Sequence, residues 1–493
     1  MAEETPHILI GSGPAALAAA IDLAVAGQPV LVLEKEPKVG GKAVGVDRDG
    51  FRFDTGPTVL TMPFVLDALF ASSGVLREEY LPLLRVEPTC RYHWSDGTVL
   101  DAWSDRTRLL DAVERAVPGA STRVGRYLDE AATLYRATAD LFLFNSFSIA
   151  SALHPSRLSL LPLLPRLGLL SRLHRRLERR LGEPKLVQLF DRFATYNGSS
   201  PYRAPATLSI IPHVELAFGA WYPQEGGMRS VPLAMARRAG ELGVEIRTDT
   251  AVRALRRTGR TVTGVVTDTG VLPCRSVLST VDALWTYRTL LAPVDVRPSR
   301  TLERAERSCS GFLVHAEVEG IHASLPHHSI FFADEYSQEF ADIFERRRLP
   351  RSGTIYVSIA ARSDPRSAPI GCENWYMLAN APSGGVDHSD ALAHERYAES
   401  MFVRLGQFGL QPQVRAVSRI TPLDVEMRDN AVGGALYGAA SHSFASAFLR
   451  PQARVPGLDN MLLAGGTVHP GGGVPLAILS GRIAARELLG RVR

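Results

Sequence analysis

The stretch "ILIGSGPAALAAA", residues 8–20, decides the fold of this chain of 493 residues. The apolar run at residues 7–10 predicts a buried strand. The pattern G-x-G-x-x-A follows at residues 11–16, and the alanine- and leucine-rich residues 15–25 predict a helix. A strand, a glycine turn and a helix in this order place the pyrophosphate of a dinucleotide on the N-terminus of the helix.

Each position of this turn has a physical role. Gly11 permits the tight turn out of the strand, and Gly13 lets the backbone approach the pyrophosphate. The third position packs the helix against the strand, and the alanine at Ala16 is small enough for it. A second predicted strand at residues 30–33 is followed by Glu34, 21 residues after Gly13, which is the spacing of an acid that binds ribose hydroxyls. The alternative is a glycine-bearing turn followed by a surface glutamate.

A pair of glycines follows the second strand in "KEPKVGGKAVGVDRDGFRFDTGPTVLTMP", which begins at Lys35. Gly40 and Gly41 come too soon after the strand for a crossover helix, and two adjacent glycines let backbone amides approach a ligand closely. Lys42 adds a positive charge beside them. The Gly-Pro pair at residues 56–57 predicts a turn.

Two further segments carry glycine pairs next to a predicted strand and helix. The first, "YPQEGGMRSVPLAMARRAGELGVEIRTDTAVRAL" from Tyr222, predicts a helix at about residues 230–242 and a strand at 244–247. The second, "NMLLAGGTVHPGGGVPLAILSGRIAARELL", predicts a strand at residues 461–464 and a helix with Pro475 in its first turn. No second G-x-G-x-x-G/A pattern with strand context is evident, so a nicotinamide domain is not expected.

These segments resemble the flavin-dependent amine oxidase and phytoene desaturase superfamily, in which a glutamate at the second strand is followed by R-x-G-G-R. Lys38 and Lys42 stand at the two arginine positions, which keeps the charge but loses the bidentate fork. The run "FDTGPT" resembles the carotenoid desaturase branch. The stretches "HHSIFFADEYSQEF" from His327 and "TVHPGGGVPLAILSG" from Thr467 are most similar to the hydroxycarotenoid 3,4-desaturases of the methoxyneurosporene dehydrogenase type.

The resemblance implies an α/β fold, with a Rossmann-like FAD-binding domain built from discontinuous segments and an α+β substrate-binding domain. Residues 1–85, 222–290 and 441–493 are expected to form the FAD-binding domain, and residues 86–221 and 291–440 the substrate-binding domain. The residues that it implies for FAD binding are Gly11, Ser12, Gly13, Pro14, Ala15, Ala16, Glu34, Lys35, Gly40, Gly41, Lys42, Gly56, Pro57, Thr58, Val252, Gly465, Gly466, Val474 and Pro475.

The reaction that the resemblance implies is FAD-dependent desaturation of an acyclic carotenoid, at the 3,4 bond of a hydroxylated or methoxylated substrate. Three alternatives stay open: a phytoene desaturase acting earlier in the pathway, a flavin amine oxidase, and a carotenoid-binding protein that keeps FAD for folding. The amine oxidases of the superfamily use a lysine of the substrate domain and an aromatic cage. No lysine follows Lys185 and no tryptophan follows Trp375. Both absences favour a hydrocarbon substrate.

No catalytic residue is assigned from the sequence. His213, Glu215, His327 and His469 are candidate bases by residue type only, because a base must lie beside the proton that it removes. The 4 cysteines lie far apart without a CxxC pattern, so neither a metal site nor a disulfide framework is predicted.

The formal net charge of +4 is small, and no nucleic-acid motif is present, so a nucleic-acid partner is not expected. The stretch near residues 154–182 combines many leucines with arginines, which favours contact with anionic lipid. Its alternative is a solvated arginine face over a leucine core. The acidic N-terminus indicates no signal peptide. The expected location is therefore cytoplasmic, peripheral on the inner face of the membrane. The expected electron acceptor is a quinone or oxygen.

Overall fold

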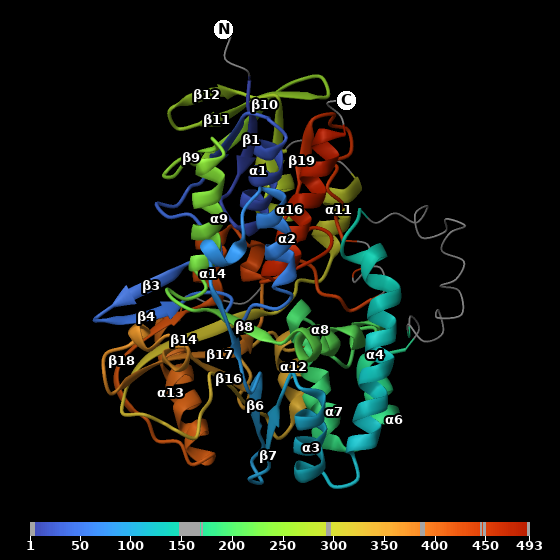
Figure 1. Ribbon diagram of the computed structural model, residues 1–493, viewed down its shortest axis with the longest axis vertical. Coiled ribbons are helices and arrows are strands. Elements are labelled where there is room, and N and C mark those ends of the chain that lie inside the picture. The colour runs from blue at the N-terminus through green and yellow to red at the C-terminus, as the bar shows by residue number, and fades with distance from the viewer. Residues whose placement is uncertain are drawn as a thin grey trace.

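The computed structural model describes residues 5–146, 168, 171–291, 297–384, 390–443, 446 and 450–490. Two sheets organise the chain (Figure 1). A five-stranded sheet lies in the upper half of Figure 1, and a seven-stranded sheet lies in the lower half.

The five-stranded sheet is parallel, with the strand order β19-β13-β1-β2-β9. Strands β1 and β2 are buried along their whole length and apolar except for His7, as expected for a parallel sheet covered on both faces. The sheet therefore collects segments that lie far apart in the sequence. Its strands are β1 His7–Ile10, β2 Val30–Leu33, β9 Glu245–Arg247, β13 Ser276–Ser279 and β19 Met461–Leu463.

Helix α1 packs against three other helices beside this sheet, α2, α9 and α16. A proline stands at the first position of α1, where its fixed φ suits the helix and its missing N–H costs no hydrogen bond. Helices α1 and α16 approach closely because Gly481 has no side chain. The helices are α1 Pro14–Val25, α2 Phe64–Ser72, α9 Ser230–Glu241 and α16 Val474–Leu489.

Three smaller antiparallel sheets are also present in the described part of the chain. One has three strands, and residues 268–269 connect β11 to β12. Two others have two strands each. The strands are β3 Gly45–Arg48 with β4 Phe51–Asp54, β5 Leu83–Val86 with β8 Ala220–Pro223, and β10 Val252–Thr258, β11 Thr261–Thr267 and β12 Gly270–Pro273.

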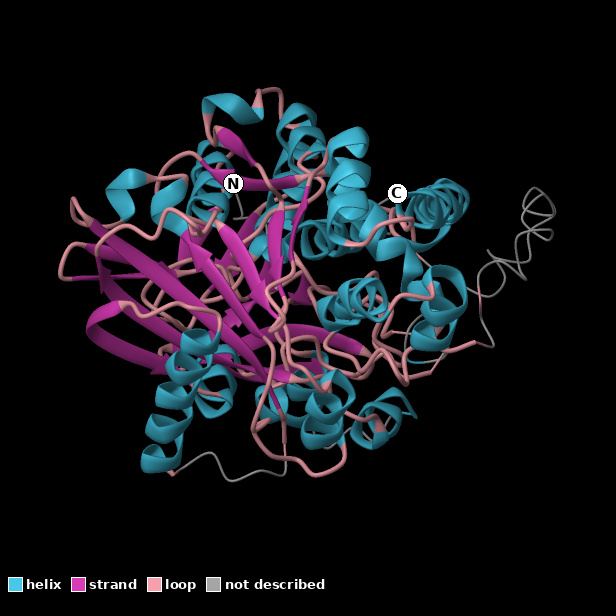
Figure 2. Ribbon diagram, turned by 90° about the horizontal axis from the view of Figure 1, so that it is seen from below, coloured by secondary structure: helices cyan, strands magenta, loops and turns pink. Residues whose placement is uncertain are grey.

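The seven-stranded sheet has the order β18-β14-β17-β16-β15-β6-β7. It is antiparallel except where β15 runs parallel to β6. Figure 2 shows this broad sheet from below, with helices gathered at its side. The strands are β6 Cys90–His93, β7 Val99–Ala102, β14 Ser310–Glu319, β15 His328–Phe331, β16 Ile355–Ile359, β17 Cys372–Ala381 and β18 Gln413–Ile420.

A group of helices, α3 to α8 in Figure 1, lies beside this sheet. Helix α4 packs against α3, α6, α8 and the short 3-10 helix η4. The helices are α3 Arg106–Ala116, α4 Ser121–Phe142, α6 Leu173–Leu181, α7 Pro184–Asp191, η3 Arg192–Asn197, η4 Ala206–Ile210 and α8 Ile211–Phe218. Further helices are α10 Ala283–Trp285, α11 Arg297–Arg304, α12 Tyr336–Phe344, α13 Ala391–Gln407 and α14 Pro422–Asp429.

The elements predicted around the opening stretch are confirmed, with small shifts at their ends. The first helix begins one residue earlier than expected, at Pro14, and the helix at residues 230–242 ends at Glu241. Most of the leucine- and arginine-rich stretch near residues 154–182 lies outside the described residues; its described end forms α6. Within the described part of the chain, no helix combines the length and apolar character needed to cross a bilayer.

Candidate active site

The glycine turn before helix α1 fixes the carboxylate of Glu34. The Ser12 amide and the Ser12 hydroxyl both donate hydrogen bonds to Glu34 Oε2, over 2.8 and 2.6 Å. The Glu36 amide donates to Oε1 over 3.0 Å, and the Gly40 amide donates to Ser12 Oγ over 3.2 Å. These bonds join the first turn, the end of β2 and the glycine pair into one unit.

The space in front of helix α1 is lined by backbone. Gly13 is the N-cap of α1, and no side chain caps the helix. The amides of Ala15 and Ala16 therefore have no partner within the helix. Gly41 faces Gly13, since a Cβ added to Gly41 would lie 3.2 Å from Gly13 Cα. Free amides at the positive end of a helix suit a pyrophosphate, so the residues present fit the pyrophosphate of FAD.

Thr280, which the sequence did not single out, lies between the first and last glycine segments. A Cβ added to Gly11 would lie 2.8 Å from Thr280 Oγ1, and a Cβ added to Gly465 would lie 3.0 Å from the Thr280 carbonyl oxygen. Both glycines have positive φ values, 93° and 107°. The two segments thus meet at the end of β13, and neither position accepts a side chain.

Three other predicted cofactor residues are Val252, Lys42 and Lys35. The first lies near Glu34, and the two lysines contact backbone carbonyls of the segment 427–436. Val252 is the buried first residue of β10, and the amide of the nearby Thr250 donates to the Glu34 carbonyl over 2.8 Å. Lys42 Nζ donates to the Leu436 carbonyl over 2.8 Å, and burial lowers the pKa of this lysine. Lys35 instead donates to the Met427 carbonyl at the end of α14, over 2.9 Å.

A cavity of about 390 Å³ begins at the predicted cofactor residues. Gly56, Pro57 and Thr58 line it from one segment, and Val474 and Pro475 line it from the N-terminus of α16. Apolar side chains form much of the remaining wall: Val59, Met62, Phe142, Leu143, Leu208, Ile210, Ile211, Val214, Ile330, Leu378, Leu436 and Leu476. The cavity therefore joins the cofactor segments to an apolar chamber.

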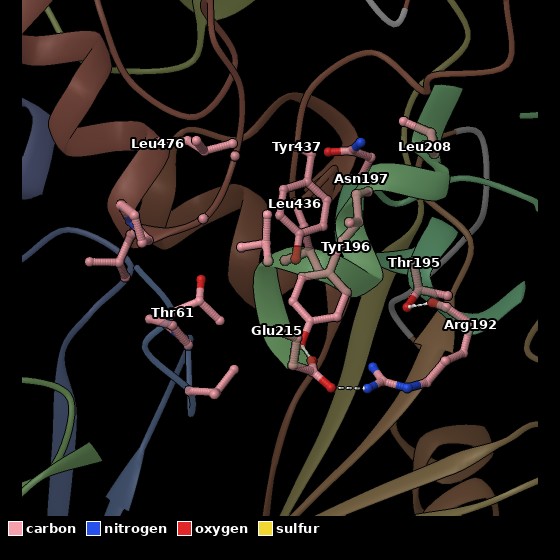
Figure 3. Close-up of a pocket in the computed structure, with 18 of the residues that line it drawn as sticks. Thr61, Arg192, Thr195, Tyr196, Asn197, Leu208, Glu215, Leu436, Tyr437 and Leu476 are labelled. Carbon is pink, nitrogen blue, oxygen red and sulfur yellow. Dashed lines mark hydrogen bonds and ion pairs between the residues drawn. The ribbon is translucent and has the colours of Figure 1, made fainter. Parts of the chain in front are cut away.

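A buried polar cluster interrupts this apolar wall (Figure 3). Arg192 Nη2 donates a hydrogen bond to Glu215 Oε1 over 2.5 Å, and the Tyr196 hydroxyl donates a hydrogen bond to Glu215 Oε2. Arg192 also donates to the hydroxyl of Tyr92, over 2.9 Å from Nε and 2.6 Å from Nη2. Burial raises the pKa of Tyr196 well above its usual value, so its hydroxyl stays protonated. We call Arg192, Tyr196 and Glu215 the polar triad.

A second polar chain crosses the wall of the cavity from Thr58 to His328. Thr58 Oγ1 lies 2.7 Å from the Tyr356 hydroxyl, which lies 2.8 Å from His328 Nδ1. Burial holds the pKa of His328 well below its ordinary value, so the ring is neutral. Its Nε2 makes no hydrogen bond within the described residues, and neither does Thr207 Oγ1 on the same wall.

The four candidate bases divide between the cavity and the surrounding core. Glu215 and His469 line the cavity. His213 packs its ring against Tyr135 instead, and His327 Nδ1 lies 2.6 Å from Ser363 Oγ. Neither of the latter two belongs to the wall of the cavity as described.

Sequence reasoning missed His328 because it singled out its neighbour, His327. Successive side chains of a strand point to opposite faces, so only one histidine of such a pair can face the cavity. His328 begins β15 and lines the cavity. The adjacent pair of histidines was the available signal.

A nucleotide cradle, combined with an apolar cavity lined by the segments of Gly56 and Val474, is the arrangement of an FAD-dependent oxidoreductase. The chain belongs to the family described as flavin containing amine oxidoreductase, whose model matches residues 15–372.

Several similar proteins have the names of carotenoid desaturases. The chain is 34% identical to the 1-hydroxycarotenoid 3,4-desaturase of Flavobacterium sp. (strain P99-3), over 97% of this chain and 98% of that protein. It is 36% identical to the hydroxyneurosporene desaturase of Rubrivivax gelatinosus, over 98% of this chain and 93% of that protein. The resemblance to carotenoid desaturases that the sequence motifs predicted is confirmed.

Solved structures confirm the fold. A putrescine oxidase bound to putrescine has a TM-score of 0.65 at 15% identity, with 99% of each chain covered. An oxidoreductase from Methanosarcina mazei has a TM-score of 0.66 at 15% identity, over 97% of this chain and 99% of that chain. The predicted α/β fold is therefore correct. The match to the flavin-containing family confirms FAD as the predicted cofactor.

Proposed function

We propose that this chain desaturates an acyclic carotenoid, at the 3,4 bond of a hydroxylated or methoxylated substrate. The observation that carries the proposal is the cavity: apolar side chains form much of its wall, and it begins at the segments of Gly56 and Val474. A long polyene is apolar, and an apolar cavity is the expected site for such a ligand. The names of the relatives support the same substrate class.

The cofactor residues in this proposal are those of the cradle and of the cavity entrance. Gly13, Gly41 and the first turn of α1 would hold the pyrophosphate, and Glu34 would accept a hydrogen bond from the ribose. Gly465 and Gly466 would lie along the ribityl chain. Support comes from the hydrogen-bonded unit around Ser12 and from the backbone-lined space before α1. Residues 1–85, 222–290 and 441–493 would form the FAD-binding domain, and residues 86–221 and 291–440 the substrate-binding domain.

The bound flavin supplies the hydride acceptor that desaturation needs, because no side chain can accept a hydride. The protein contributes orientation and exclusion of water. Leu436, Leu476 and Val59 would hold the polyene beside the cofactor entrance, since all three line the cavity. His328 lines the cavity, and its Nε2 makes no hydrogen bond within the described residues, so this atom would be placed to receive the proton that the substrate carbon loses. Burial lowers the pKa of the ring, which makes it a weak base.

An amine oxidase remains the second candidate because putrescine oxidase shares the fold. A site for an amine needs an aromatic cage or a carboxylate that is free to pair with the ammonium. Glu215 lines the cavity but already accepts hydrogen bonds from Arg192 and Tyr196. Because this carboxylate is already paired with Arg192, the cavity favours a neutral substrate over a cation.

The proposal includes a quinone or oxygen as the final electron acceptor and contact with the membrane surface. A water-insoluble polyene must enter from lipid, which favours a peripheral position. Exposed arginines on α6, Arg175, Arg179 and Arg180, support attraction to anionic headgroups.

Expression of the chain in bacteria that make hydroxylated acyclic carotenoids tests the proposal. The pigments should absorb at longer wavelength, because each added double bond lengthens the conjugated system. Parallel cultures that make only phytoene separate a late desaturase from an early one. Unchanged pigment in the presence of flavin-loaded protein would defeat the proposal.

A further inference from the structure

We infer that the polar triad of Arg192, Tyr196 and Glu215 is a binding site for an alcohol group on the substrate, and that it selects hydroxylated over unsubstituted polyenes. This inference rests on the proposed function and deepens it, because it assigns the choice of substrate to named side chains. It also ranks alcohols above methyl ethers.

The triad has unused hydrogen-bonding capacity that is complementary to a hydroxyl. Arg192 donates from Nε and Nη2, while its Nη1 makes no hydrogen bond within the described residues. Each oxygen of Glu215 accepts one hydrogen bond from this triad, which leaves each oxygen a further lone pair. A guanidinium donor beside a carboxylate acceptor matches an alcohol, which accepts through its oxygen and donates through its proton.

The burial of the triad argues that it has a ligand. Arg192 is only 8% exposed and Glu215 only 4% exposed, yet both line the cavity. Removing two charges from water is costly, and a buried ion pair often stabilises a fold no better than apolar side chains of equal size. An apolar wall would serve an unsubstituted hydrocarbon better. A charged pair on the wall is therefore explained by a polar group on the substrate.

Three elements hold the triad in one geometry. Arg192 and Tyr196 lie on η3, and Glu215 lies on α8. Tyr92 on β6 accepts two hydrogen bonds from Arg192. Figure 3 shows the Glu215 carboxylate between the Tyr196 ring and the Arg192 guanidinium. A site held from several elements discriminates by geometry, because the polar atoms cannot move away from a mismatched ligand.

The donor and acceptor pattern sets an order of preference among three polyenes of equal length. A terminal alcohol uses both Arg192 and Glu215. Its methyl ether can accept from Arg192 but has no proton for Glu215. The parent hydrocarbon satisfies neither group and displaces any water that solvates them, and sites built for a hydroxyl reject analogues that lack it.

The experiment compares these three substrates with the FAD-loaded enzyme. One readout is kcat/KM for each substrate. The other is the Kd of each polyene for enzyme whose flavin has been reduced chemically, measured by quenching of tryptophan fluorescence, because no turnover occurs in that state. Wild-type protein should favour the alcohol over the hydrocarbon by about 10- to 100-fold in both readouts, as expected for hydrogen bonds to charged groups. The ether should fall between them.

Two conservative variants test the triad itself, Glu215→Gln and Tyr196→Phe. Each should reduce the preference for the alcohol over the hydrocarbon by roughly 10-fold, because the alcohol loses more than the hydrocarbon does in kcat/KM and in Kd. The matched control is Tyr202→Phe, since Tyr202 packs against His174 and is not part of the cavity wall as described. Flavin content and circular dichroism show whether each variant has folded. If one of the two has not folded, the substrate preference of the other tests the inference.

Equal constants for alcohol and hydrocarbon in the wild type would overturn the inference. A proportional loss with all three substrates in both folded variants would overturn it as well. The proposed function fails separately: if none of the three is oxidised but the reduced enzyme still prefers the alcohol, the binding site stands and the desaturase does not. If the polyenes are oxidised without preference, the desaturase stands and the alcohol site does not.

Discussion

The amide and the hydroxyl of Ser12 both donate hydrogen bonds to one oxygen of the Glu34 carboxylate, over 2.8 and 2.6 Å. A residue of the first glycine turn thus holds the acid at the end of the second strand. The other oxygen accepts from the Glu36 amide over 3.0 Å. The position of the carboxylate is therefore set by the fold, and one lone pair of Oε1 remains available to a ligand.

Replacement of this acid should weaken FAD binding without unfolding the chain. Glu34→Gln keeps the shape of the side chain but removes the charge that strengthens these hydrogen bonds. The Kd for FAD, measured by adding FAD to protein stripped of it, should rise about 10- to 100-fold. Glu36→Gln is the matched control, because the Glu36 side chain contacts Lys35 at the surface. Equal affinities for the two variants would count against the assigned role of Glu34.

Gly13→Val should abolish flavin binding while the protein folds. A Cβ at this position would lie 3.9 Å from Gly41 Cα, so the fold accommodates it. The larger side chain then fills the space in which the pyrophosphate would lie. The purified variant should be colourless, with native circular dichroism. Gly406→Val, in helix α13 with open space around it, should stay yellow. A yellow Gly13→Val protein would show that the cradle is assigned to the wrong backbone.

Gly481→Ala should destabilise the protein despite the better helix propensity of alanine. The added Cβ would lie 2.0 Å from the Ala15 carbonyl oxygen, so helices α1 and α16 must separate. Overpacking of this kind costs about 1–3 kcal/mol. Thermal unfolding should show a lower Tm. Gly240→Ala, also helical but with open space around it, should instead raise the Tm. An unchanged Tm in Gly481→Ala would contradict the close approach of the two helices.

Asp54 should make the stability of the protein fall as pH rises from about 4 to about 6. Burial raises the pKa of this carboxyl from 3.8 to about 6, although Tyr222 and the Met228 amide donate to it. The folded state therefore binds the proton more tightly than the unfolded chain in this range. Above about pH 6 the full cost of the buried charge is present.

Asp54→Asn removes this titration. At pH 8 the variant should be more stable than the wild type by up to about 3 kcal/mol, and the difference should vanish near pH 4. Denaturant unfolding at several pH values measures the effect. Asp49→Asn, at an exposed position, should follow the wild-type curve. Parallel curves for the wild type and Asp54→Asn would contradict burial of an ionised Asp54.

The sequence predicted those features that depend on short spacings. Strand β1, helix α1, strand β2 and Glu34 follow each other within 30 residues of chain, so turn chemistry and apolar patterning locate them. The contact between Ala15 and Gly481 was not predictable, because it joins residues from opposite ends of the chain.

The polar triad was beyond sequence reasoning for the same physical reason. Glu215 was a candidate only as an acidic residue, and its partner Arg192 was one arginine among many. Tyr92, which holds Arg192, lies 100 residues earlier in the chain. Only the packing of η3, α8 and β6 around one cavity brings these side chains together.

The most direct measurement of the proposed function is a single turnover without an electron acceptor. The purified protein, loaded with FAD and kept free of oxygen, is mixed with an equimolar amount of a hydroxylated acyclic carotenoid in detergent. The flavin absorbance should bleach while the polyene spectrum moves to longer wavelength at the same rate. A flavin that stays oxidised with this carotenoid, but bleaches when an amine is added, would contradict the account.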